Sequence, residues 1–149
     1  MNVVLNIDDF KNEHTFFGTP VKNTVIEHGS FIKLIYSNSI TSLSCIYIQI
    51  PIRFLSIERY FNKLKYSFDL KDNHNMEIVK KLCLIENTIL GKINIDKQPV
   101  FHLYNKLSTG FIRMDIEKEH SNTKERYLFL KISGIWETKY NYGLSFKFV

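Results

Sequence analysis

The run Tyr127-Leu-Phe-Leu-Lys-Ile-Ser-Gly-Ile-Trp-Glu137 decides the fold class of this chain. Leu128, Leu130 and Ile132 fall on one side of an extended backbone, which is typical of a half-buried β-strand. The opposite side carries Tyr127, Phe129, Lys131 and Ser133. Gly134 predicts a bulge that bends the strand, as a small barrel requires.

Several other runs have the period of two that favours strands. In one, Leu64, Tyr66 and Phe68 alternate with Lys63 and Lys65. The runs that predict strands are 2–8, 24–27, 31–36, 43–50, 64–70, 111–116, 127–137 and 142–149. Residues 9–23 carry a Gly-Thr-Pro turn and predict a connecting loop. The charged segment 117–126 also predicts a loop. Residues 54–62 are ambiguous, and a helical turn is one alternative for them.

One long helix is predicted between these runs. Ile78, Leu82, Ile85 and Ile89 recur at helical spacing within 75–90, with Asn75 as the N-cap and Gly91 as the terminator. A shorter helix is predicted over 100–107, closed by Gly110. This order predicts a mainly β, α+β fold: an OB-like five-stranded barrel or a strongly curved antiparallel sheet with one long helix. No linker or repeat interrupts 1–149, so one domain is expected.

Charge and cysteine content narrow the class of protein. The net charge is +5, from 20 Lys and Arg against 15 Asp and Glu, which favours an anionic partner. Cys45 and Cys83 form no CxxC or Cys/His pattern, so neither a disulfide framework nor a zinc site is expected. The longest apolar stretch is far shorter than the ~20 residues of a membrane span, and no signal peptide is apparent. We therefore expect an intracellular protein without a cofactor.

Catalytic motifs are weak. The sequence contains no GxGxxG, P-loop, HExxH or GxSxG pattern, and its five histidines are scattered. Asp8-Asp9 favours a turn or helix cap over a metal site, and Asp115 and Glu117 alternate with Arg113 as a surface charge ladder would. We therefore do not expect an enzyme.

Basic and aromatic side chains share several predicted strands, as they do in proteins that bind single-stranded nucleic acid. The candidate phosphate contacts are Lys33, Lys63, Lys65, Arg113, Lys131 and Lys147. The candidate base-stacking rings are Tyr47, Tyr127, Phe129 and Trp136. Packing of these rings in a core, with lysines protecting sheet edges, is the competing interpretation.

Three segments together resemble a known group of proteins: residues 17–25 with 31–37, residues 130–138 (Leu-Lys-Ile-Ser-Gly-Ile-Trp-Glu-Thr), and residues 142–148 (Tyr-Gly-Leu-Ser-Phe-Lys-Phe). The whole resembles small proteins of nucleocytoplasmic large DNA viruses. The closing strands are also similar to the end of phage-type single-stranded-DNA-binding proteins with an OB fold. The resemblance implies a viral protein of host cytoplasm or nucleus that acts in DNA replication or recombination.

Three hypotheses follow from these observations. The leading one is binding of single-stranded DNA, or of RNA, without catalysis, by a chain that could form a homodimer. The second is a protein-interaction or virion structural module whose exposed aromatic residues and sheet edges form an assembly interface. The third is a nucleic-acid enzyme in which Asp8, Asp9, Asp115 or Glu117 holds a divalent metal.

Overall fold

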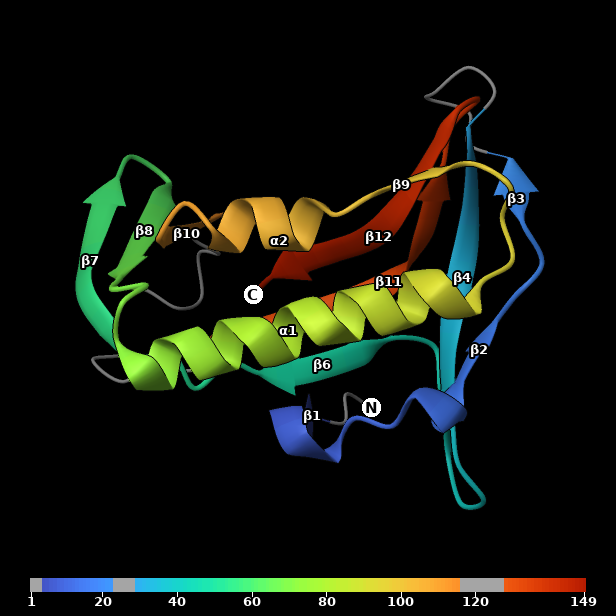
Figure 1. The fold of residues 1–149 in the computed structure, drawn as a ribbon, viewed down its shortest axis with the longest axis horizontal. Coiled ribbons are helices and arrows are strands. Elements are labelled where there is room, and N and C mark those ends of the chain that lie inside the picture. The colour runs from blue at the N-terminus through green and yellow to red at the C-terminus, as the bar shows by residue number, and fades with distance from the viewer. Residues whose placement is uncertain (1–3, 23–28, 116–127) are drawn as a thin grey trace.

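A computed structural model describes residues 4–22, 29–115 and 128–149 of the chain. In these ranges, two β-sheets and two α-helices enclose one apolar core (Figure 1). Among the described residues, the main sheet has nine strands and a second sheet has three. The main-sheet strands are β1 (Val4–Leu5), β2 (Thr15–Phe17), β3 (Val21–Lys22), β4 (Ser30–Ser37), β5 (Ser42–Leu43), β6 (Ile46–Gln49), β9 (Gln98–Val100), β11 (Phe129–Glu137) and β12 (Asn141–Phe148).

Strand β11 organises the main sheet. Its first half, Phe129–Ile132, pairs with β6, and its second half, Gly134–Glu137, pairs with β4, while β12 lies along its other edge. The register shifts between Ile132 and Gly134, which confirms the predicted bulge. The bulge bends the strand where its neighbour changes from β6 to β4.

The sheets do not close into a barrel, so the prediction of a five-stranded OB-like barrel is wrong. The coarser prediction of a mainly β, α+β fold is confirmed. The main sheet is mixed, because β1 pairs with β6 and β9 pairs with β12 in parallel. Its order β1-β6-β11-β12-β9, with β4 branching from β11, leaves separate edges that do not meet. The bend at Gly134 redirects β11 without closing the sheet.

The small sheet has the order β10-β8-β7 and consists of β7 (Phe54–Tyr60), β8 (Lys63–Phe68) and β10 (Phe111–Asp115). The predicted alternation of β8 is confirmed, since Tyr66 and Phe68 are buried. The alternative of a helical turn at 54–62 is wrong, because these residues form strand β7 and the turn that connects it to β8. Apolar and polar side chains alternate poorly in β7 because most of them are exposed.

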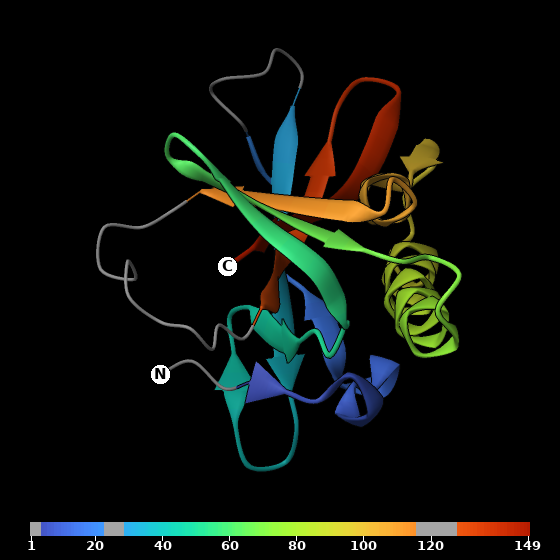
Figure 2. The ribbon, with the colours of Figure 1, turned by 90° about the vertical axis from the view of Figure 1, so that its left-hand side faces the viewer.

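Helices α1 (Asn73–Lys92) and α2 (His102–Leu107) lie on one side of the main sheet (Figure 2). We call that side the helix face and the opposite side the outer face. Ile78, Leu82, Ile85 and Ile89 of α1 are all buried, as their spacing predicts. They pack in one core with buried side chains of the main sheet, among them Ile46, Ile48, Leu130, Ile132 and Leu144.

The ends of α1 differ from the prediction. The N-cap is Asp72, whose Oδ2 accepts a hydrogen bond from the Asn75 backbone N–H at 3.0 Å. Asn75 is instead buried, and its side-chain amide bonds to both the N–H and the C=O of Arg53. Gly91 does not end the helix, which continues to Lys92. The prediction that Gly110 ends the second helical segment is confirmed, because Gly110 follows α2 and has a φ of 83°.

Two N-terminal predictions are also corrected. Within residues 4–8, the described part of the predicted strand 2–8, only Val4–Leu5 is a strand, and Ile7–Asp9 forms a 3-10 helix, η1. The predicted loop 9–23 contains a second 3-10 helix, η2 (Asn12–His14), followed by β2 and β3. These strands are too short for a period of two to stand out. The strand predicted at 24–27 and the loop at 117–126 lie outside the described residues.

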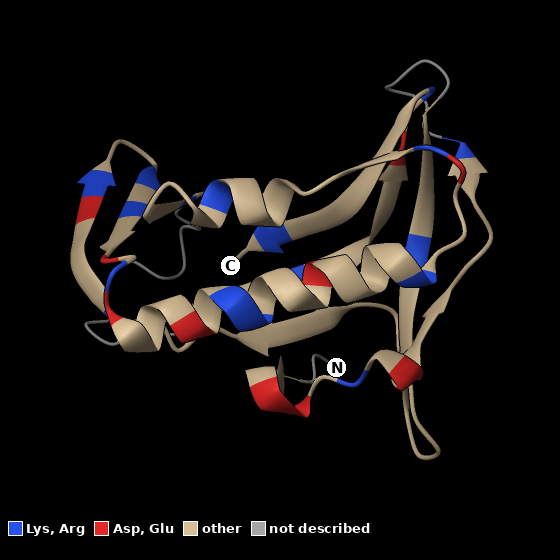
Figure 3. Cartoon of the chain, in the orientation of Figure 1, with Lys and Arg blue, Asp and Glu red and all other residues tan. Residues whose placement is uncertain are grey.

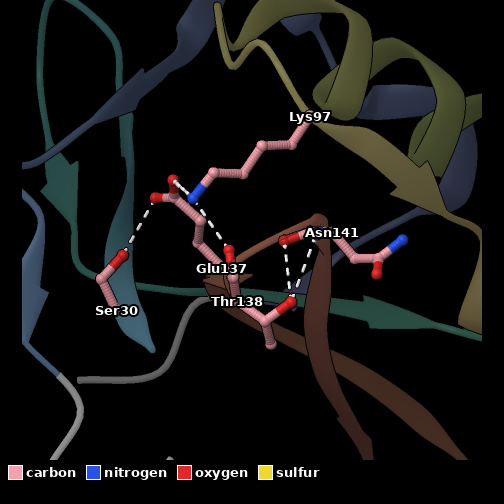
Figure 4. A network of polar contacts seen from close by, with 5 residues as sticks. All are labelled: Ser30, Lys97, Glu137, Thr138 and Asn141. Carbon is pink, nitrogen blue, oxygen red and sulfur yellow. Dashed lines mark hydrogen bonds and ion pairs between the residues drawn. The ribbon is translucent and has the colours of Figure 1, made fainter. Parts of the chain in front are cut away.

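A polar network joins three distant segments at the far end of β11 (Figure 4). Glu137 accepts hydrogen bonds from Ser30 Oγ at 2.9 Å and from Lys97 Nζ at 2.5 Å. Lys97 also donates to the Thr138 carbonyl at 2.8 Å. Lys97 lies in the loop before β9, so the network fastens this loop to β4 and β11.

Candidate functional site

The outer side of the small sheet carries three of the ten predicted site residues. Residues paired across antiparallel strands share a face, and Arg113 of β10 pairs with Lys65 of β8. Lys63 lies two residues before Lys65 and therefore points to the same side, opposite Tyr60 of β7. The buried Tyr66 and Ile112 point the other way, into the core. The alternation seen in the sequence thus brings Lys63, Lys65 and Arg113 together.

Phe111 holds two of these cations in place. Lys65 Nζ lies 4.6 Å from the centre of the Phe111 ring, and the Arg113 guanidinium carbon lies 4.9 Å from it. The face of an aromatic ring attracts a cation and so restricts the rotamers of a lysine or arginine side chain. The ammonium or guanidinium group can stay hydrated at the same time. The two positive charges are therefore already positioned side by side before any ligand arrives.

Two shallow hollows meet at Arg113, and together we call them the basic groove. One has a volume of about 300 Å³ and the other about 220 Å³. Their described lining residues are Tyr60, Lys63, Leu64, Lys65 and Arg113 in the first, and Lys106, Thr109, Phe111, Ile112, Arg113 and Phe148 in the second. Four of these residues are cationic and three are aromatic, and none of them is acidic. Figure 3 shows basic residues on β7, β8 and α2 at this end of the molecule.

Two carboxylates lie on the same side of the small sheet without lining the groove. Glu58 pairs across strands with Lys65, and Asp115 pairs with Lys63. The Tyr60 hydroxyl donates to Glu58 Oε2 at 3.0 Å, and this hydrogen bond raises the pKa of Tyr60, together with the charge of Glu58. Arg113 acts on the pKa of Tyr60 in the opposite direction, which places its charge close to the phenol.

Helix α2 contributes the part of the groove that the sequence analysis missed. Lys106 Nζ lies 5.3 Å from the centre of the Phe146 ring, and the buried Phe148 forms part of the floor. Tyr60 was missed because its segment was not recognised as a strand. Phe111 could have been found, since it alternates with Arg113 on one strand, whereas only the tertiary structure brings Lys106 to this place.

The outer face of the main sheet carries six other predicted site residues. Tyr47, Lys131 and Lys147 form one row across β6, β11 and β12. Lys131 Nζ lies 5.7 Å from the centre of the Tyr47 ring. Phe129 pairs with Gln49 in the next row and is half-buried. These rings do not lie beneath α1, because both helices pack on the opposite side (Figure 2).

Lys33 and Trp136 lie further along the same outer face. Lys33 is exposed and pairs with Gly134, and Trp136 pairs with Gly143. The half-buried indole covers Gly143 and lies with its ring centre 5.3 Å from that of His102. The predicted cations therefore divide between two sheets and do not converge on one channel. Tyr127 lies outside the described residues.

The residues of the metal-enzyme hypothesis are separated by the fold. Asp8 lies in η1 and accepts a hydrogen bond from Lys81 Nζ at 2.8 Å, whereas Asp115 lies on the small sheet. The described ranges contain no group of three or more His, Cys, Asp or Glu side chains that could hold a metal ion. Glu117 lies outside these ranges. Cys45 and Cys83 are free thiols, and burial raises the pKa of Cys83 to about 11.

No helix in the described part of the chain is long and apolar enough to cross a bilayer. Comparison with protein-family models, with curated protein sequences and with solved structures finds no match to this chain.

Proposed function

We propose that this protein binds single-stranded nucleic acid in the basic groove of the small sheet. The observation that carries the proposal is the shared position of Arg113 in two adjoining hollows with four cations and three rings among their lining residues. A strand of nucleic acid presents phosphates at regular intervals with bases between them. A groove that alternates positive charge with ring faces is complementary to that pattern.

The cations would contact phosphates and the exposed rings would stack on bases. Tyr60 is 57% exposed, and the Phe111 ring is half-buried between Lys65 and Arg113. Stacking on a protein ring requires a base whose own face is free, which a single strand offers and a duplex does not. We therefore expect single strands to bind more tightly than duplexes of the same length.

The test is a fluorescence anisotropy titration of a labelled oligothymidine over a series of salt concentrations, with oligouridine and a duplex of equal length as further ligands. Each phosphate contact on a single strand releases counterions and contributes a slope of about −0.7 in log K against log salt. Four cations in the groove therefore predict a slope of about −2.8. Absence of binding at low salt would disprove the proposal.

A pair of matched variants tests the location. Lys63→Ala with Lys65→Ala removes two groove cations and should reduce the salt slope by about 1.4. Lys80→Ala with Lys139→Ala makes the same change in net charge at exposed positions that do not line the groove. The control should keep the slope of the unaltered protein.

A third variant tests the outer face of the main sheet. Lys131→Ala with Lys147→Ala removes the cations of its basic row and should leave the slope unchanged if the groove alone binds. A loss confined to this variant would move the site to the main sheet. An equal loss in all three variants would mean that binding follows net charge alone.

A further inference from the structure

The free edge of β7 exposes two aliphatic side chains beside unpaired backbone groups. Among the described residues, β7 pairs only with β8, and its side chains Leu55 and Ile57 are 74% and 55% exposed. The strand has seven residues, among them the charged Glu58 and Arg59, and its unpaired backbone groups are a template for another strand.

The backbone groups that face this edge can be identified. Phe68 N–H donates to the Gly110 carbonyl, so in β8 the amides of Leu64, Tyr66 and Phe68 point toward β10. The amides of Lys63 and Lys65 therefore point toward β7, where they pair with Tyr60 and Glu58. By the same alternation, the N–H and C=O groups of Ile57 and Arg59 point outward from the sheet, away from β8.

We propose that β7 pairs in antiparallel fashion with β7 of a second copy of this chain, about a two-fold axis through Ile57. A two-fold axis through Arg59 or Glu58 would place like charges directly opposite each other, which is unfavourable. An axis through Ile57 pairs Ile57 with itself and Glu58 with Ser56 of the second copy, and regular pairing ends at the bulge between Phe54 and Ser56. This register contains no like-charged pair.

The side chains at this edge also suit a second copy. Ile57 pairs with the buried Tyr66, which pairs with the buried Ile112, so the three form one apolar row on the core side of the small sheet. Pairing about Ile57 continues this row into the same row of the second copy. The exposed Ile57 then gains an apolar neighbour that the single chain does not supply.

Sedimentation equilibrium of nucleic-acid-free protein in high salt tests the proposal independently of nucleic-acid binding. A single pair of strands is a small interface, so the concentration series should reach about 1 mM. At that concentration a dimer with a Kd of about 100 μM is well populated. Ile57→Lys should raise the dimer Kd about tenfold or more, because it places two ammonium groups at the axis. Ile40→Lys makes the same chemical change at a side chain that is 87% exposed in the connection between β4 and β5, and should leave the Kd unchanged.

Cysteine cross-linking tests the register. In a Cys45→Ser, Cys83→Ser background, Ile57→Cys should form an intermolecular disulfide under mild oxidation, because directly paired Cα atoms lie within disulfide reach. Glu58→Cys should not, since the two copies of residue 58 would lie more than about 7 Å apart. A monomer at every concentration, equal effects of the two lysine variants, or equal cross-linking at 57 and 58 would overturn the proposal.

Discussion

Phe61 occupies an unfavourable backbone conformation at the tip of the β7–β8 hairpin. Its φ is 51°, a region that bulky residues rarely adopt, and its side chain is 96% exposed. Such strain costs about 1–3 kcal/mol and tends to occur at functional sites. The exposed ring provides no packing that would offset this cost, and it adjoins Tyr60 of the basic groove in sequence.

We predict that Phe61→Gly stabilises the fold by about 1 kcal/mol, because glycine adopts positive φ without strain. Urea denaturation measures the change. If the ring also contacts a bound strand, the same substitution weakens oligonucleotide binding while it raises stability. A loss of stability would show that the ring packs against the protein in solution.

Glu137 is the residue whose titration most directly links pH to stability. The hydrogen bond from Lys97 lowers the pKa of its carboxyl below the ordinary value of 4.5, and the bond from Ser30 acts in the same direction. Because the folded pKa lies below the unfolded one, the stabilisation is complete above about pH 4.5 and is lost as the pH falls through the folded pKa.

Glu137→Gln should therefore destabilise the protein by about 1–2 kcal/mol at pH 7, with the difference from the unaltered protein disappearing in acid. Chemical denaturation at several pH values provides the measurement. Glu77→Gln is the control, since the Glu77 side chain is 69% exposed and its ion pair with Lys81 is long, at 3.9 Å. An equal loss in both variants at pH 7 would remove the special role assigned to the Glu137 network.

At the scale of single elements, Gly134 determines the path of β11. A Cβ atom on this residue would lie 2.1 Å from the Ile32 carbonyl oxygen and 2.8 Å from Cζ of Phe31. The first of these contacts is with backbone, which cannot rotate aside. The bulge therefore requires glycine, because β4 approaches β11 closely there.

Gly134→Ala is expected to destabilise the fold by about 3 kcal/mol, as overpacking against a fixed backbone does. The matched control is Gly91→Ala, because a Cβ atom at Gly91 of α1 would meet no atom within 4 Å. That substitution should stabilise the helix by about 0.5–1 kcal/mol. Thermal and urea unfolding of both variants decide the point, and a neutral Gly134→Ala would contradict the close approach.

For the molecule as a whole, Trp136 can report which surface a ligand occupies. The chain has one tryptophan, and it lies half-buried on the outer face of the main sheet, whereas the basic groove lies on the small sheet. Stacked bases quench indole emission. We predict that an oligonucleotide bound in the groove leaves the emission of Trp136 unchanged while the anisotropy of its label rises. Quenching that saturates with the anisotropy would place the ligand on the main sheet.

Alternation along β6, β8, β12 and the first half of β11 predicted which side of each strand faces the core, but beyond the bulge at Gly134 Ile135 is buried and Trp136 is only half-buried. Helical spacing likewise predicted the core face of α1. These predictions succeeded because burial on one side leaves a period in the sequence. The ends of α1 were not predictable, since both Asp72 and Asn75 are good capping residues and only the buried bonds of Asn75 to Arg53 distinguish them.

The sequence by itself determined a mainly β chain with one long helix, a bulge at Gly134, and the pairing of basic with aromatic residues on strands. Only the tertiary structure decided that the sheets stay open, that the predicted cations divide between two faces, and that Lys106 joins Arg113 at the basic groove. Periodicity reports which side of a strand faces the core, a local property. The neighbours of a strand and the distance between its sheet's edges depend on contacts between residues far apart in the chain.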